Sequence, residues 1–288
     1  MTPLASRGAV LITGCSSGIG RATALELARS GRPVYATARR PDTLAELKRA
    51  GCRILPLDVT DEESMRAAVG VVESEHGAVG ALVNNAGYAV YGPVEQVPID
   101  DVRKQFETNV FGLARLTQLV LPAMRERKSG TIVNVSSMGG RITLPGGAFY
   151  HASKYALEAI SNALRFEVEP FGIAVVVVEP GPVDTPWNDV AAGSLDAASA
   201  NSDTGADPYA KFKAAVARAF HTASHGTLAR QMSSTPEDVG RVIARAIDSR
   251  RPRTRYLVGG TARALVTLEA VLPDRLYDAA LRRQYGLS

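Results

Sequence analysis

The chain of 288 residues has only two cysteines, Cys15 and Cys52, and their separation fits no metal-ligand motif such as CxxC. A disulfide framework and a cysteine-based zinc site are therefore not expected, and a reducing, cytoplasmic setting is predicted. No apolar run approaches the roughly 18 residues that a membrane-spanning helix needs. The N-terminus also lacks the pattern of a secretory signal. The sequence thus predicts a cytoplasmic protein without an integral membrane segment.

Histidine is scarce too, and of the four in the chain only His221 and His225 have the spacing to bind one ion from a single helix face. The glutamate of an HExxH motif and a third ligand are missing. No metal site is therefore expected.

Net charge is a modest +4, but residues 241–288 hold ten arginines against four acidic residues. The run RRPRTR at 250–255 has the charge to contact nucleic acid or an anionic membrane surface. Aromatic side chains that would stack on bases do not interleave it. We therefore expect a solvated loop and no nucleic-acid partner, with peripheral membrane association as an open alternative.

Short runs rich in Val, Ile and Leu recur along the chain, and segments of helical period separate them. Their continuous apolar character is typical of strands buried on both faces. The alternation predicts one α/β domain over residues 1–288, a doubly wound Rossmann-type fold with helices on both faces of a mostly parallel, seven-stranded sheet. The expected strands are 9–13, 33–37, 53–57, 80–84, 131–136, 173–179 and 255–258.

Two segments depart from this alternation. Small and polar residues dominate 189–207, which favours either a substrate lid at about 186–235 or a tolerated surface insertion. At about 259–288 a helical, arginine-rich extension is expected.

The first strand ends in TGCSSGIG, residues 13–20, and a helix follows. Glycines permit a tight turn whose amides, together with the positive helix end, can face a pyrophosphate. The spacing differs from the common GxGxxG, and the Gly-Lys-Ser/Thr of a nucleotide-triphosphate loop is missing. The loop alone indicates either a dinucleotide site or a plain glycine turn.

An acidic residue is also missing at the end of the second strand, where NAD-selective dehydrogenases hold the ribose 2′-hydroxyl. The chain reads YATARRPD there. The guanidinium groups of Arg39 and Arg40 suit a 2′-phosphate in charge and geometry. NADP(H) is therefore the predicted cofactor, although either arginine would also suit an exposed helix start.

Six motifs follow one another along the chain: the glycine loop, NNAG at 84–87, NVFG at 109–112, VSS at 135–137, YHASK at 150–154 and PGPVDT at 180–185. In order and approximate spacing they resemble the classical short-chain dehydrogenases/reductases over about residues 7–185. Several stretches are similar to the branch with hydroxysteroid and retinol dehydrogenases. The resemblance implies an NADP(H)-dependent oxidoreductase, assembled as a homodimer or homotetramer through the long helices after the fourth and fifth strands.

The resemblance also implies roles for matching residues. Tyr150 would be the general acid/base, Lys154 its activator, Ser137 the hydroxyl that orients the carbonyl, and Asn109 the holder of a water relay. The cofactor-binding residues would be Gly14, Ser16, Ser17, Gly18, Ile19, Gly20, Arg39, Arg40, Asp58, Val59, Asn85, Ala86, Gly87, Tyr150, Lys154, Pro180, Gly181, Val183 and Thr185.

Elementary chemistry supports the pair formed by Tyr150 and Lys154. Positions i and i+4 share a helix face, so the two side chains can lie together. A phenol with a pKa of about 10 is a poor base at neutral pH. A neighbouring ammonium and a positively charged oxidised nicotinamide both favour phenolate, so we expect a lowered pKa for Tyr150.

Candidate residues for the substrate pocket are mostly apolar or aromatic, which indicates a lipophilic ketone or aldehyde and the corresponding alcohol. They are Tyr88, Val90, Tyr91, Met138, Ile142, Leu144, Phe149 and Trp187. The alternative is a non-catalytic NADP(H)-binding regulatory or scaffold protein of the same fold, which would not need the full catalytic set.

Overall fold

Seven runs of β-branched and aliphatic residues form the strands of one parallel sheet in the computed structural model, which describes residues 8–185, 193, 195, 207–225 and 233–287. The strands are β1 (Val10–Ile12), β2 (Val34–Ala38), β3 (Arg53–Pro56), β4 (Ala81–Asn84), β5 (Gly130–Val135), β6 (Ile173–Pro180) and β7 (Arg255–Val258). Their order is β3-β2-β1-β4-β5-β6-β7, and all neighbours pair in parallel. The predicted sheet is confirmed.

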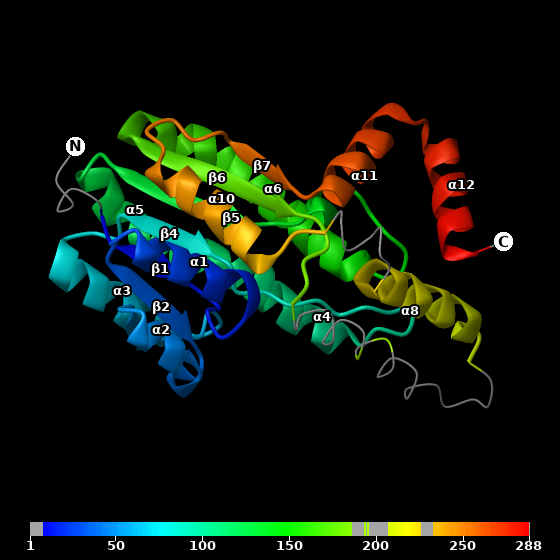
Figure 1. The fold of residues 1–288 in the computed structure, drawn as a ribbon, viewed down its shortest axis with the longest axis horizontal. Coiled ribbons are helices and arrows are strands. Elements are labelled where there is room, and N and C mark those ends of the chain that lie inside the picture. The colour runs from blue at the N-terminus through cyan, green and yellow to red at the C-terminus, as the bar shows by residue number, and fades with distance from the viewer. Residues whose placement is uncertain (1–7, 186–192, 194, 196–206, 226–232, 288) are drawn as a thin grey trace.

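Helices cover both faces of the sheet, as predicted. On one face α1 (Gly18–Arg29), α2 (Ala45–Arg49) and α10 (Pro236–Asp248) bury apolar side chains against the strands. On the other face α3 (Glu62–His76), α5 (Leu113–Glu126) and α6 (Ala148–Val168) do the same (Figure 1). Shorter elements are η2 (Pro41–Leu44), α4 (Ile99–Phe106), η3 (Glu107–Gly112), η4 (Met138–Gly140) and η5 (Glu169–Phe171).

The loops after β1 and β4 are joined by side-chain hydrogen bonds. Asn85 Nδ2 donates to the carbonyl oxygens of Thr13 at 2.9 Å and Gly14 at 3.0 Å. In return, Thr13 Oγ1 accepts from the backbone N–H groups of Asn85 and Ala86, both at 3.0 Å. The strand order reverses at β1, where open α/β sheets bind their ligands. The two loops therefore form a rigid floor at this position.

The helical segment between β4 and β5 is not one regular α-helix. Between α4 and α5 the backbone takes a π-helical turn, η3, which carries Asn109. A Cβ on Gly112 would lie 2.2 Å from the carbonyl oxygen of Val59. The absence of a side chain thus lets this turn approach the loop after β3, and π-turns of this kind are frequent at functional sites.

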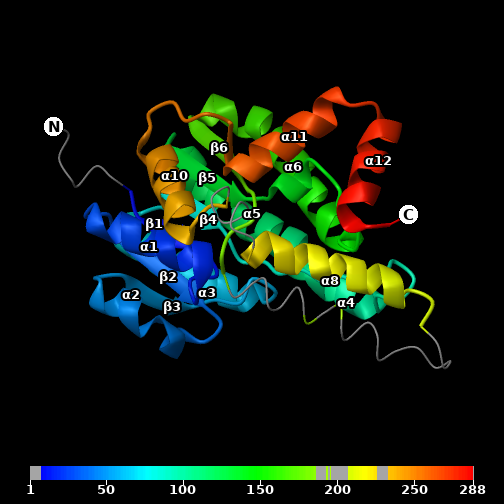
Figure 2. The same cartoon turned by 45° about the vertical axis from the view of Figure 1, so that its right-hand side comes forward.

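Two further helices follow β7. The helices α11 (Gly260–Val271) and α12 (Asp274–Tyr285) project past the carboxyl ends of the strands, and α12 turns back toward α8 (Ala210–His225) (Figures 1 and 2). Much of the predicted lid at about 186–235 lies outside the described residues, as do Trp187 and the side chains of His221 and His225. Within the described ranges, none of the helices combines the length and apolar character needed to cross a bilayer. The cytoplasmic location stays a prediction.

The close approach at Gly112 gives a test of the packing. Gly112→Ala should lower the free energy of unfolding by about 1–3 kcal/mol, because the new methyl group forces backbone to move. Gly70→Ala is the matched control: Gly70 lies inside α3 with no described atom within 4 Å of an added Cβ, so helix propensity should raise stability by about 0.5–1 kcal/mol. Urea unfolding measures both. Equal stability of the two variants would contradict the packing described.

Candidate active site

A cavity of about 1460 Å³ opens at the carboxyl ends of the strands. Five of the six sequence motifs contribute residues to its walls: the glycine loop, NNAG, VSS, YHASK and PGPVDT. NVFG does not, although Glu107 and Thr108 just before it do. Segments far apart in the sequence therefore meet around one space because parallel strands end at the same edge of the sheet.

Most of the predicted cofactor-binding residues line this cavity. They are Gly14, Ser16, Ser17, Gly18, Ile19, Arg39, Asp58, Val59, Asn85, Ala86, Gly87, Tyr150, Lys154, Pro180, Gly181, Val183 and Thr185.

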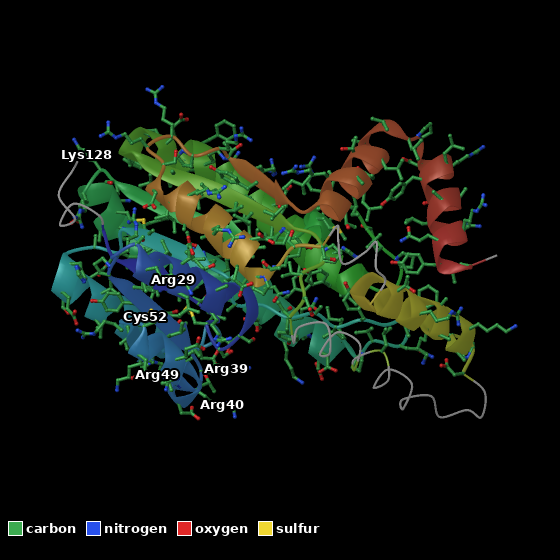
Figure 3. The ribbon with its side chains drawn as sticks, in the orientation of Figure 1. Arg29, Arg39, Arg40, Arg49, Cys52 and Lys128 are labelled. Atoms are coloured by element: carbon green, nitrogen blue, oxygen red, sulfur yellow. The ribbon has the colours of Figure 1, made fainter. Side chains whose placement is uncertain are left out.

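Gly20 and Arg40, also predicted to bind the cofactor, do not line the cavity. A Cβ on Gly20 would lie 2.4 Å from the carbonyl oxygen of Gly14, so Gly20 serves close packing of α1 against the glycine loop. Figure 3 shows Arg39 and Arg40 at the same corner of the molecule. Only Arg39 reaches the cavity, since successive residues of the extended chain after β2 point to opposite sides.

The glycine loop has the shape that a dinucleotide requires. Gly14 and Gly18 have φ of +69° and +55°, conformations that L-residues rarely adopt. A Cβ on Gly14 would come within 2.9 Å of Ala86 Cα. The side chain of Ser17, the N-cap of α1, makes no capping hydrogen bond to the described chain. Gly18 and Ile19, the first residues of α1, line the cavity, so the partial positive charge of the helix N-terminus lies there, which fits a diphosphate.

Three predicted catalytic side chains meet on one wall. Tyr150 and Lys154 lie one turn apart on α6, with Lys154 Nζ 5.9 Å from the centre of the tyrosine ring. Lys154 Nζ also donates to the carbonyl oxygen of Val135 at 2.9 Å. Ser137 hydrogen-bonds the Tyr150 phenol and accepts from the N–H of Gly139 at 3.0 Å. The hydroxyl groups of Ser137 and Tyr150 are thus close enough together to hydrogen-bond the same substrate oxygen.

Asn109 lies behind this wall rather than on the cavity. Its Nδ2 donates to the carbonyl oxygen of Tyr88 at 2.8 Å and to Ser153 Oγ at 3.1 Å, and its Oδ1 accepts from the N–H of Tyr88 at 3.1 Å. A Cβ on Gly87 would lie 3.0 Å from Asn109 Oδ1 and 3.8 Å from Lys154 Nζ. Asn109 therefore ties the loop after NNAG to α6, and its role in a water relay stays a prediction.

Burial shifts the two titratable groups in opposite directions. It lowers the pKa of Lys154 to about 8, against the opposing charge of Glu158. It raises the pKa of Tyr150 to about 12, against the hydrogen bond from Ser137. The lowered phenol pKa expected from the sequence is thus not found in the protein alone, because loss of hydration disfavours phenolate. Tyr150 stays protonated near neutral pH, the form that donates a proton.

His151 was not expected at the site. It is buried and lines the cavity next to Tyr150, with the two rings edge to face at 5.6 Å. Its Nε2 accepts from the N–H of Leu144 at 3.1 Å, so Nδ1 carries the hydrogen and donates to the carbonyl oxygen of Gly139 at 2.9 Å. Burial lowers the pKa of His151. A neutral imidazole of fixed tautomer therefore joins the η4 turn to α6.

The residues that line the substrate end of the cavity differ in part from those predicted. Tyr88, Tyr91, Met138 and Leu144 line it, whereas the side chains of Val90, Ile142 and Phe149 do not. The C-terminal helices, expected only as an extension, supply a further wall. It consists of Thr261 and Leu265 from α11 and Gln284 and Tyr285 from α12.

Tyr285 belongs to the same apolar cluster as Tyr91 and Tyr150, whose rings lie 6.0 Å apart. Sequence reasoning missed this wall because no local motif links 261–285 to a strand end.

The chain is similar to known proteins in sequence and fold. The family model described as short chain dehydrogenase matches residues 8–193. A 3-ketodihydrosphingosine reductase of Bacteroides thetaiotaomicron is 34% identical over 280 residues, which cover 96% of this chain and 98% of the relative.

Two solved structures are also similar. A short-chain dehydrogenase from Streptomyces avermitilis superposes with a TM-score of 0.77 at 34% identity, over 100% of this chain and 98% of its own. A serine dehydrogenase in its closed form, complexed with NADP+, gives a TM-score of 0.73 at 27% identity, over 87% and 94%.

Proposed function

Because the chain belongs to the short-chain dehydrogenase family, we propose that it is an NADP(H)-dependent oxidoreductase that interconverts a ketone or aldehyde and an alcohol on a lipophilic substrate. The observation that carries this proposal is the convergence of Ser137, Tyr150 and Lys154 on the cavity whose floor is the glycine loop. A protein that only binds the cofactor does not require the Tyr150 phenol and the Ser137 hydroxyl next to the buried Lys154 ammonium.

The residues divide the chemistry between them. A bound nicotinamide supplies or accepts the hydride. In the reducing direction Tyr150 donates its proton to the substrate oxygen, while Ser137 donates a hydrogen bond to the same oxygen as negative charge develops on it. Lys154, when protonated, stabilises the phenolate that remains. In the oxidising direction the phenolate accepts the proton of the alcohol.

The lining of the cavity supports a lipophilic substrate. Apolar and aromatic surface comes from Tyr91, Met138 and Leu144, together with Leu265 and Tyr285 of the C-terminal helices. Pockets of this composition bind ligands chiefly by burying apolar area. The similarity to a 3-ketodihydrosphingosine reductase favours the same class.

Preference for NADP(H) rests on Arg39, and Ser17 also lines the cavity. Arg39→Ala should weaken NADPH binding about 10- to 100-fold, since a hydrogen bond to a charged group contributes about 1.5–3 kcal/mol. NADH binding should change little. Calorimetric titration of both cofactors measures this. Arg40→Ala is the control, because Arg40 is exposed and outside the cavity; an equal loss in both variants would contradict the assignment.

The catalytic role of Tyr150 has a direct test. Tyr150→Phe should slow NADPH oxidation by lipophilic ketones and aldehydes about 10²- to 10⁴-fold, because the proton donor is lost. NADPH affinity should stay near that of the wild type. The assay follows NADPH absorbance with carbonyl compounds of increasing chain length and ring size, and the reverse reaction with the alcohols. Tight NADPH binding without turnover in either direction would instead support the regulatory or scaffold protein.

We also propose a homodimer or homotetramer that forms through α5 and α6. Phe111, just before α5, is 56% exposed and Phe166 on α6 is 74% exposed. Large exposed aromatic side chains are typical of subunit interfaces.

The oligomer can be weakened at Phe166. Phe166→Glu should lower the mass measured by light scattering, because a carboxylate would have to be buried at the interface. Leu276→Glu is the control, since Leu276 is 57% exposed on α12, which is not one of the two helices of the proposed interface. A monomeric wild-type protein would rule out the interface.

A further inference from the structure

Three charged side chains lie together where α6 packs near β6 and β7, and none of them has a role in the reaction described above. Glu158 comes from α6, Glu179 from β6 and Arg255 from β7. Arg255 Nη2 lies 2.5 Å from Glu158 Oε2, and its Nε lies 2.6 Å from Glu179 Oε1. The side chains of Glu158 and Glu179 are only 7% and 1% exposed, and that of Arg255 is 29% exposed. Arg255 is thus the one member of the RRPRTR run that points inward.

The cluster is next to Lys154. Glu158 follows Lys154 by one helical turn, so the two side chains share a face of α6. Its carboxylate is the charge that opposes the effect of burial on the Lys154 pKa. Gly140 packs against this part of α6: a Cβ there would lie 2.9 Å from Glu158 Cγ and 3.2 Å from the backbone carbonyl oxygen of Lys154. The absence of a side chain at 140 lets the η4 turn cover this side of the helix.

Lys154 contributes to the charge balance around the two buried carboxylates. Glu158 and Glu179 bring two negative charges and Arg255 brings one positive charge. Arg141 faces Glu179 at 3.6 Å, but its side chain is 40% exposed, so solvent screens it. Arg165 on α6 bonds the carbonyl oxygen of Val175 and the amide of Asn162 instead of either carboxylate. Burial and the Glu158 charge also raise the pKa of Glu179, and Arg165 interacts with the Glu158 charge. The Lys154 ammonium is therefore one of the positive charges that face Glu158.

The hydrogen bonds of Glu158 also indicate that its charge matters. Its Oε2 is bonded to Arg255, whereas Oε1 is buried and accepts no hydrogen bond from any described residue. A buried acceptor without a partner costs about 1–3 kcal/mol. Glutamine would fill the same volume and still accept from Arg255 without burying a charge. What glutamate adds is therefore its charge.

We propose that Glu158 is a positioning residue for the reaction: its carboxylate, aligned by Arg255, keeps Lys154 in the ammonium form beside Tyr150. The catalytic consequence rests on the proposed function. The charge state of Lys154 does not, because it can be measured without turnover.

The expected direction follows from the two opposing effects on Lys154. Burial lowers its pKa and the Glu158 charge raises it, with a net value of about 8. Without the carboxylate, burial acts alone, so the pKa falls further. At neutral pH a larger fraction of Lys154 would then be neutral, and Tyr150 would lose the positive charge that stabilises its phenolate.

The test is an NMR titration of protein labelled with carbon-13 at its lysines. The chain has six lysines, and Lys154→Gln identifies the signal of interest. Glu158→Gln should lower the Lys154 midpoint by about one pH unit, the size expected for loss of one nearby charge. Glu158→Asp keeps the charge and should stay closer to wild type. Glu167→Gln, at an exposed position on α6, is the matched control and should leave the midpoint unchanged.

The outcomes are distinct. A folded Glu158→Gln variant with the wild-type midpoint overturns the proposal, and so does an equal shift in the glutamine and aspartate variants, which indicates packing alone. If Glu158→Gln does not fold, Glu179→Gln removes one carboxylate of the same cluster and should give a smaller fall; an unchanged or raised midpoint overturns the proposal.

Turnover provides a separate readout. Where a ketone is reduced with NADPH, the alkaline limb of the kcat profile should move to lower pH in Glu158→Gln by the shift that NMR records, with KM unchanged. If no carbonyl compound is turned over by the wild type, the proposed function fails while the NMR titration still decides the role of Glu158.

Discussion

The interaction on which the site depends is the burial of one ammonium group. Lys154 is almost fully enclosed, yet its charge is useful only if it persists next to the Tyr150 phenol. A buried charge persists when acceptors and counter-charges surround it. The carbonyl oxygen of Val135 at the end of β5 provides the acceptor, and Glu158 provides the counter-charge. The packing of α6 against β5, β6 and η4 therefore sets the electrostatics of the reaction as well as the stability of the core.

A second constraint holds the other end of the cavity. The hydrogen bonds between Thr13, Asn85 and their neighbouring backbone groups fix the loops after β1 and β4 relative to each other. Asn109 fixes the next stretch, because it holds Tyr88 by both its N–H and its carbonyl. The floor under a cofactor is thus built from side chain to backbone bonds, and none of these bonds uses an N–H group of the glycine loop, the groups that suit phosphate oxygens.

Sequence reasoning was most successful where the signal is local. The alternation of apolar runs and helical segments predicts the parallel sheet, and six short motifs place Ser137, Tyr150 and Lys154 in one site. It failed where the cause is distant in the chain. The π-turn at Asn109 packs against the loop after β3 because Gly112 has no side chain. Burial lowers the pKa of His151, and its hydrogen bonds with Leu144 and Gly139 fix the tautomer. The inward orientation of Arg255 depends on carboxylates from two other elements. The sequence alone therefore does not distinguish Arg255 from the exposed arginines beside it.

The wall supplied by Leu265 and Tyr285 lies on different elements from Ser137, Tyr150 and Lys154. Tyr150 lies on α6 and Ser137 is the N-cap of η4, while part of the lining of the substrate end comes from helices beyond the last strand. A change of shape in α11 or α12 can alter the choice of substrate without displacing Tyr150. Because these residues lie on different elements, substitutions in α11 and α12 can change substrate specificity while Ser137, Tyr150 and Lys154 stay in place.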